Sequence, residues 1–399
     1  MNTSTLPAGN YDPNFGVLGR AELPQFISQG RNITDIALQQ ENILASALAF
    51  DSSGRRYYAM TRFSANGEID LHFADEGIKF GLFNSEEQSS TEALAVTEDE
   101  HILLLGWSAA WGSQLTKPVI CWFSPDGAGP TRTSWLGVPD DTGLVIGKNR
   151  LTVNAQHLLA SINLLATQDR PGTARVYRQG LDGTPGFGSL EFIEILPGDD
   201  DVSICGLVQL PDTFLVSGTQ ALGKPEQQGF IACYRNDGTL DPSFGAEGVI
   251  RLRAAEQPTS LNHFLQRPSG ELIVAGCAHA GNPLRNHALL WQFTQNGSPD
   301  TSFNNGEPVL TDLSPPLDNS WHSMTLALDN KLVVIGEGNG IRYMRFMPNG
   351  TVDTQYQPFD GLAGITEGIG CLARLDNTLL CFNSTAAIGV VGTVMSIFS

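Results

Sequence analysis

Short apolar runs recur along the chain, and clusters of Asn, Asp, Gly and Pro separate them. Four of the clearest runs read Ile-Leu-Leu-Leu-Gly, Phe-Leu-Val-Ser-Gly, Leu-Ile-Val-Ala-Gly and Leu-Val-Val-Ile-Gly, at residues 102–106, 214–218, 272–276 and 332–336. Apolar runs of this length, bounded by turn-forming residues, are typical of buried strands. A shorter strand precedes each run across a tight turn, as at 98–100. The pattern therefore predicts antiparallel strands and no long helix.

One phrase recurs after these strands: an aromatic residue, then Asn-Gly or Asp-Gly, then often Asp, then Phe or Tyr. Good copies lie at 63–73, 234–245, 293–303 and 346–356, and degenerate copies at 123–127 and 177–183. The turn glycines at 67, 127, 183, 238, 297 and 350 are 60, 56, 55, 59 and 53 residues apart. Asn-Gly and Asp-Gly suit the positive-φ positions of hairpin turns. Each unit therefore predicts four antiparallel strands, named a to d from the inside out.

A repeated four-stranded unit predicts blades arranged around an axis. A spacing near 57 fits seven units into 399 residues, yet six phrases are complete, and the beginning of the chain matches the second half of one, since 10–16 resembles 240–245. We therefore predict an all-β fold: one seven-bladed β-propeller domain, 1–399, of four-stranded antiparallel blades. Residues 11–19 would complete the last blade, formed by 362–399, and close the ring.

The phrase resembles the delta-60 repeat, a bacterial β-propeller repeat, over nearly the whole chain. The resemblance is strongest at 234–248, 293–306 and 346–356. It implies a propeller and brings no common activity. The four aspartates that follow the turn glycines, Asp70, Asp241, Asp300 and Asp353, are predicted to hydrogen-bond within turns, because one such loop offers too few oxygen ligands for calcium.

The net charge of the chain limits the classes of molecule that it is expected to bind. The 23 basic and 42 acidic residues give a net charge of −19, and only 16% of residues are charged. Such a chain repels phosphate backbones, so no nucleic-acid partner is expected. No apolar stretch is long enough for a membrane span, so no membrane insertion is expected. We also expect the chain to be a monomer. Without a signal peptide the chain is expected in the cytoplasm, with signal-independent export left open. The six cysteines lack zinc spacing and are predicted to be reduced core thiols.

Loops that join strands b to c and d to a share one face of a propeller, and here they are long and unlike one another. Binding residues favour such loops. The candidate ligand-binding residues on this loop-rich face are Trp107, Trp111, His279, Asn282, Arg285, His287 and Trp321. Tryptophan rings stack on sugars, so a carbohydrate-binding module is one hypothesis.

A second candidate site lies near the mouth of the central channel. Counting fourteen residues back from the glycine of strand b gives Glu92, Asn262 and His322, and Ile204 in another unit, with Asp35 at a similar level. A histidine with two acids is able to hold a divalent metal or to perform acid–base chemistry. Three hypotheses follow: a non-enzymatic platform that recognises a protein or small ligand without a cofactor, a metal-assisted hydrolase or lactonase-like enzyme, and the carbohydrate-binding module. The platform is favoured.

Overall fold

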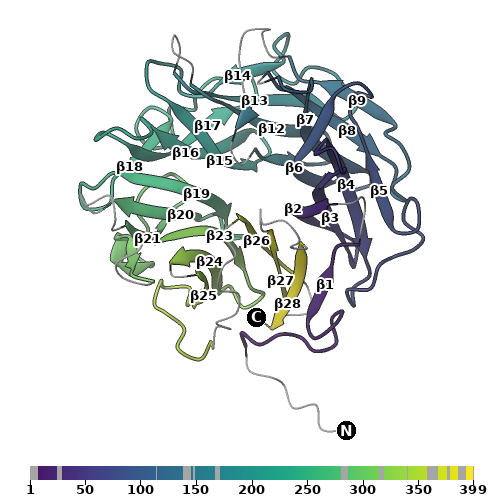
Figure 1. The fold of residues 1–399 in the computed structure, drawn as a ribbon. Helices are drawn as coiled ribbons and strands as arrows, with labels where there is room; N and C mark the ends of the chain where they lie inside the picture. The colour runs from purple at the N-terminus through teal and green to yellow at the C-terminus, as the bar shows by residue number, and fades with distance from the viewer. Residues whose placement is uncertain are drawn as a thin grey trace.

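The computed structural model arranges the chain as seven sheets around a central channel (Figure 1). It describes residues 8–24, 29–113, 115–137, 145–146, 149–166, 171–279, 286–313, 319–338, 340–356, 367–374, 378–384 and 392–398. Paired strands within each sheet are antiparallel, and most pairs join strands that are consecutive in the sequence. The predicted seven-bladed β-propeller is therefore confirmed.

The blades are numbered along the chain. Blade 1 contains β2 (Gln29–Gln39), β3 (Asn42–Phe50), β4 (Arg56–Phe63) and β5 (Ile78–Gly81). Blade 2 contains β6 (Gln88–Val96), β7 (Ile102–Ala109), β8 (Lys117–Phe123) and β9 (Arg132–Trp135). Blade 3 contains β10 (Val145–Ile146), β11 (Leu151–Val153), β12 (His157–Leu164), β13 (Thr173–Gly180) and β14 (Phe192–Glu194). Blade 4 contains β15 (Val202–Gln209), β16 (Thr213–Gln220), β17 (Gln228–Arg235) and β18 (Val249–Leu252).

Blade 5 contains β19 (Thr259–Gln266), β20 (Leu272–His279), β21 (Asn286–Phe293) and β22 (Val309–Thr311), with a short 3-10 turn, η1 (Asn304–Gly306), before β22. The described part of blade 6 contains β23 (Ser320–Leu326), β24 (Leu332–Gly338) and β25 (Gly340–Phe346). Blade 7 contains β26 (Glu367–Ala373), β27 (Thr378–Ser384), β28 (Thr393–Phe398) and β1 (Arg20–Glu22).

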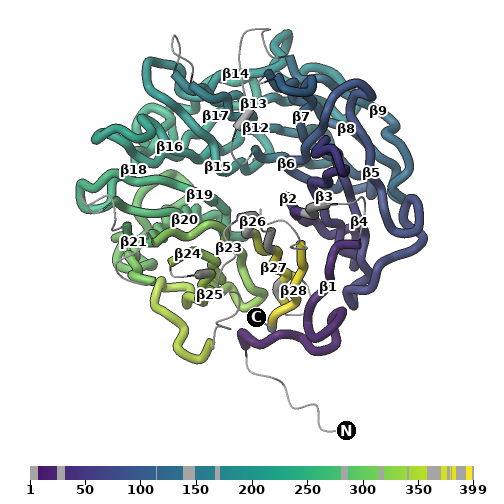
Figure 2. Tube along the Cα trace, in the orientation of Figure 1, coloured from purple at the N-terminus to yellow at the C-terminus, as the bar shows by residue number. Residues whose placement is uncertain are grey.

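The two ends of the chain meet in blade 7, where the purple N-terminal segment runs beside the yellow C-terminal strand (Figure 2). β1 pairs antiparallel with β28, with Arg20 opposite Met395. Upstream, Tyr11 forms an isolated bridge with Ile397. Closure of the ring by the N-terminus is as predicted, although the pairing strand lies just after residues 11–19. Main-chain hydrogen bonds thus join the last blade to the start of the chain.

The repeated phrase ties several blades to the next one. The Phe303 ring is fully buried against Gly350 in the turn of the following blade, where an added Cβ would lie 3.2 Å from the ring. The residue after it, Asn304, donates its main-chain N–H to the Asn349 carbonyl at 2.9 Å. The same pair of contacts joins Phe73 and Ala74 to blade 2, and Phe15 and Gly16 to blade 1. We call this arrangement the interblade clasp.

The aspartate of the phrase holds the turn in shape. Asp353 accepts the Gln355 main-chain N–H at 3.0 Å and the Arg345 guanidinium at 2.8 Å. The corresponding N–H bonds reach Asp70, Asp241 and Asp300 from the residue two positions later. This confirms the predicted turn hydrogen bonding of these carboxylates.

The cores lie between neighbouring blades and contain the apolar runs predicted as strands b and c. None of the six cysteines forms a disulfide; five are buried and Cys371 is partly buried, as predicted. Within the described residues there is no helix with the length and apolar character needed to cross a membrane.

Candidate ligand cavity in the central channel

The inner strands carry a bulge at one repeated level. In β6, Thr91 pairs with Gly106 and Ala93 with Leu105, so Glu92 is the extra residue. The same register shift occurs at Asn262 in β19 and at His322 in β23. A bulge re-aims the side chain of its extra residue. The glycine-based alignment therefore identified the bulged position in three blades.

In blade 4, the count of fourteen residues from the strand b glycine gives the residue before the bulge. Ile204 pairs with Gly218, and the register shift falls at Cys205. In blade 1 the extra residue is Thr34, and Asp35 is the next residue, paired with Ser46. Sequence spacing alone missed this offset because it gives the distance to the strand b glycine but not which residue is left unpaired.

The strand b glycine has a packing role beside the bulge. A Cβ on Gly276 would lie 2.0 Å from the Ser260 carbonyl oxygen, and one on Gly218 would lie 2.0 Å from the Ser203 oxygen. Inner strand and second strand approach too closely there for any side chain. This explains why the apolar runs end in glycine.

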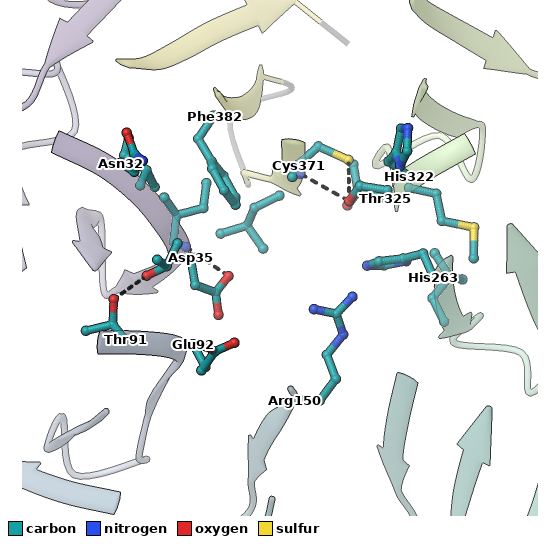
Figure 3. Close-up of a pocket in the computed structure, with 18 of the residues that line it drawn as sticks. Asn32, Asp35, Thr91, Glu92, Arg150, His263, His322, Thr325, Cys371 and Phe382 are labelled. Atoms are coloured by element: carbon teal, nitrogen blue, oxygen red, sulfur yellow. Dashed lines mark hydrogen bonds between the residues drawn. The ribbon is translucent and has the colours of Figure 1, made fainter. Parts of the chain in front are cut away.

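A cavity of about 1110 Å³ occupies the channel, and Figure 3 shows the side chains around it. The lining comes from the inner strands of several blades, with Leu48 and Phe382 from second strands. It includes Gln266 and Leu326, which are the last residues of β19 and β23. The cavity therefore runs along the inner strands, from Ser90 and His322 near their starts to the short a–b turns.

Asp35 lies in this cavity with both oxygens held by main-chain groups. The Ile36 N–H donates to Oδ1 and the Leu94 N–H of the next blade donates to Oδ2, each at 2.9 Å. Burial raises the pKa of Asp35 to about 6, although these two bonds and the charge of Arg150 oppose the shift. The carboxyl thus bridges two blades and changes its protonation within a neutral pH range.

Glu92 faces the same space one blade further on. Its Oε1 accepts the indole N–H of Trp107 at 3.0 Å. Burial raises the pKa of Glu92 to about 7, against hydrogen bonds from Trp107 and Asn149 and the charge of Arg150. The cavity therefore contains two carboxyls that are partly protonated near neutral pH.

Arg150 provides the cationic group of the cavity. Its Nε donates to the Cys205 carbonyl at 2.8 Å and its NH2 group to the Asn262 carbonyl at 3.4 Å, in blades 4 and 5. Its guanidinium lies between Glu92 and His263 in Figure 3. The glycine spacing could not lead to Arg150, because the corresponding run of blade 3 ends in Ile162 and not in glycine.

The two channel histidines differ in position. His322 is the bulged residue of β23, and its Nε2 lies 3.4 Å from the Glu337 carboxylate. His263 follows the bulged Asn262 in β19, and its ring points toward Arg150 in Figure 3. The Asn262 amide donates to Ser320 Oγ and the Trp321 carbonyl, at 2.8 and 2.9 Å, so it links blade 5 to blade 6. Asp35, Glu92 and His322 thus line one cavity, with His322 across it from the two carboxyls in Figure 3, while Asn262 is not among the lining residues.

The predicted loop-face residues are scattered. Trp321 is 0% exposed and packs edge-on to Phe346, and Trp107 is 7% exposed and bonded to Glu92. Trp111 is 62% exposed, so its ring is open to solvent. His287 Nδ1 lies 2.6 Å from the Asp312 carboxylate. Asn282 and Arg285 lie outside the described residues.

His279 stands apart from the other loop-face candidates because it joins a compact polar cluster in blade 5. Its Nε2 lies 2.9 Å from Ser260 Oγ, and its Nδ1 lies 3.0 Å from Asn286 Oδ1. Among the described residues there is no group of three or more His, Cys, Asp or Glu side chains arranged to hold a metal ion.

Comparisons with known proteins support the fold. A family model described as a domain of unknown function (DUF5122) β-propeller matches residues 215–244, 267–303 and 328–356. These segments cover copies of the repeated phrase in blades 4, 5 and 6, so they support a β-propeller family. No curated protein gave a significant match.

Solved structures of similar length have a similar fold. The crystal structure of the polysaccharide lyase Uly1 has 12% identity and a TM-score of 0.56, covering 100% of this chain and 94% of that one. A family PL25 ulvan lyase bound to -[GlcA(1-4)Rha3S]- has 9% identity and a TM-score of 0.52, covering 98% and 94%. At this identity the likeness shows the propeller fold alone.

Proposed function

We propose that this chain is a ligand-binding β-propeller that holds a small hydroxylated carboxylic acid in its central cavity without transforming it. The observation that carries the proposal is Arg150, a cation fixed to the main chain of blades 4 and 5 and directed into a cavity of about 1110 Å³. Guanidinium groups recognise carboxylates in a fixed geometry. A cavity of this size and mixed polar and apolar lining suits a small molecule.

The neighbouring groups support hydroxyl recognition. Asp35 and Glu92 accept hydrogen bonds when ionised and also donate when protonated, and their raised pKa values make both forms available near pH 7. Thr325 and Asn32 add neutral polar groups to the lining. The proposal moves the small-ligand site from the loop-rich face into the channel. Recognition of a protein partner on the loop-rich face stays a prediction.

The test compares ligands that differ only in the carboxylate. Glucuronate and galacturonate should bind in titration calorimetry, whereas glucose and galactose should bind at least about tenfold more weakly, which corresponds to about 1.4 kcal/mol. Arg150→Lys keeps the charge but loses the planar fork, so it should weaken glucuronate binding by a similar factor. Equal binding of acids and neutral sugars, or no binding of either, would overturn the proposal.

An acid–base enzyme in the same cavity is the second candidate. Its support is the pair of carboxyls with pKa values of about 6 and about 7, which is the range in which a side chain both accepts and donates protons at neutral pH. Incubation of bound glucuronides with the protein, followed by proton NMR of the ligand, distinguishes the two functions. Ligand recovered unchanged favours binding alone. A metal-assisted reaction would in addition require one bound divalent ion per chain that is lost in His322→Ala.

A further inference from the structure

We infer that Ser260, on the loop-rich face between blades 4 and 5, is an activated nucleophile that hydrolyses small carboxylic esters. The site consists of Ser260, His279, Asn286 and Gln227, and it does not rest on the channel cavity. Ser260 is the second residue of β19, His279 is the last residue of β20, and Asn286 is the first residue of β21. These three strand ends face the loop-rich side of blade 5.

The four side chains form one hydrogen-bonded cluster, in which Gln227 approaches both Ser260 and His279. The Gln227 amide nitrogen donates to Ser260 Oγ at 2.7 Å and also lies 3.0 Å from His279 Nε2. Ser260 Oγ lies 2.9 Å from His279 Nε2, and His279 Nδ1 lies 3.0 Å from Asn286 Oδ1. Because an amide oxygen only accepts, Nδ1 carries the imidazole proton. The lone pair of Nε2 then accepts from the Ser260 hydroxyl, with the Gln227 amide nitrogen as a second donor beside it. This arrangement of nucleophile, base and orienting group has the geometry of nucleophilic catalysis.

Main-chain bonds fix the members in place. The Gln227 oxygen accepts the Gly223 N–H at 2.7 Å, which determines which end of the amide faces Ser260. The His279 main-chain N–H donates to the Pro258 carbonyl at 2.8 Å. The Asn286 carbonyl accepts the Asn319 amide at 2.9 Å. A site held at strand ends by such bonds is positioned before a substrate arrives.

Comparison of the blades separates architecture from chemistry. Serine recurs at the same register in four blades, where Ser90, Ser203, Ser260 and Ser320 each pair with the residue after the strand b glycine. The residue equivalent to His279 is Ala109 in blade 2 and Ala221 in blade 4. The serine therefore belongs to the repeat, and the imidazole distinguishes Ser260 from Ser90 and Ser203.

Exposure and proton balance fit ester hydrolysis. Ser260 and His279 are partly exposed, whereas Gln227 is only 7% exposed. Ser260 Oγ attacks the ester carbonyl carbon while His279 Nε2 takes the hydroxyl proton, and the carbonyl electron pair moves to oxygen beside the Gln227 N–H. The C–O bond to the alcohol then breaks, and the alcohol leaves with the proton from His279. Water attacks the acyl-serine by the same route, so ester and water give acid and alcohol.

A thiol lies close enough to require its own variant. Cys277 Sγ is 3.8 Å from His279 Nε2, farther than Ser260 Oγ. The cysteine is buried, with 6% exposure. Ser260 is therefore the expected site of attack, and Cys277→Ala should keep at least half of the wild-type activity.

The experiment uses the full chain, with p-nitrophenyl acetate as substrate and a fluorophosphonate as covalent probe. Wild type should release nitrophenolate above the buffer rate, and the phosphonyl group should be located on the peptide that contains Ser260. Ser260→Ala should abolish both signals, and His279→Ala should lower the rate about 100-fold or more. Ser203→Ala, at the same register in blade 4, should leave both signals unchanged.

Added imidazole provides a readout that a merely structural role would not give. It should restore part of the rate in His279→Ala but not in Ser260→Ala, provided that circular dichroism shows both variants folded. Activity and labelling that persist in Ser260→Ala, or a wild-type rate equal to that of buffer, would overturn the inference. Loss of both signals in Cys277→Ala with retention in Ser260→Ala would also overturn it.

Discussion

At the scale of single residues, Glu92 couples the cavity to pH. The pKa of this carboxyl is raised from 4.5 to about 7 by burial, so the folded chain keeps a proton that the unfolded chain releases. Stability is then greatest below about pH 4.5 for this group, and it falls as pH rises from about 4.5 to about 7. Asp35 acts in the same direction between 3.8 and about 6.

Glu92→Gln should remove this pH dependence. The neutral amide resembles the protonated acid and still accepts the Trp107 N–H. The unfolding free energy of the variant minus that of wild type should therefore increase by about 2 kcal/mol from pH 5 to pH 8. Urea unfolding at both pH values measures this. Glu98→Gln, on an exposed turn, is the control, and its unfolding free energy should depend on pH as that of wild type does. The same difference between Glu92→Gln and wild type at both pH values would contradict the argument.

Glycine at the end of strand b is a second residue-scale test. Gly218→Ala would bring Cβ to 2.0 Å from the Ser203 carbonyl, and a main-chain oxygen cannot move aside without breaking the strand pairing. We expect a loss of about 3 kcal/mol in unfolding free energy. Gly198→Ala meets nothing within 4 Å and should change stability little. Unfolding in guanidinium measures the free energy of both variants. Equal stabilities would show that the inner strand and the second strand can separate at this position.

The channel site was predictable only where the repeat is regular. The glycine spacing led to Glu92 and His322 because their blades keep that glycine. It missed Arg150, whose blade has replaced it, and His263, which is one residue beyond the bulge. Of the polar cluster around His279, only the histidine was among the residues predicted from the sequence. Ser260 and Asn286 come close to it only when three strands pair.

At the scale of elements, the interblade clasp explains why the phrase recurs. Phe303 is fully buried on Gly350 of the next blade, and removal of its ring leaves a cavity between two blades. Phe303→Ala should therefore cost about 3–5 kcal/mol. Phe80→Ala, with a ring that is 48% exposed on β5, is the matched control and should cost much less. Thermal melting of both variants measures the difference, and similar melting temperatures would show that the clasp contributes little.

The elements themselves were largely visible in the sequence. Alternating turn signals and apolar runs predicted the strands, because each run is buried between two blades and has little freedom in composition. The position of the closing strand was less determined. Residues 11–19 match the repeat, yet the ladder with β28 begins at Arg20, since the matching segment forms the clasp with Phe15 and Gly16 instead.

At the scale of the whole molecule, one short N-terminal segment closes the ring. Phe15, Ala21 and Leu23 are buried in the core between blades 7 and 1. β1 also covers the outer edge of β28, and Asp12 donates its N–H to the Ser396 carbonyl at 3.0 Å. Loss of the segment would expose both a strand edge and an apolar surface, which together promote association.

Deletion of residues 1–24 should therefore lower the melting temperature and produce oligomers in size-exclusion chromatography with light scattering. Deletion of residues 1–7 keeps Tyr11, Phe15 and β1, and it should behave as wild type. A synthetic peptide of residues 8–24 should restore the melting temperature of the longer deletion, because the edge of β28 is a template for this sequence, whereas a scrambled peptide should not. A longer deletion that stays monomeric and melts like wild type would contradict closure by this strand, and equal rescue by the scrambled peptide would show that any apolar peptide covers the edge.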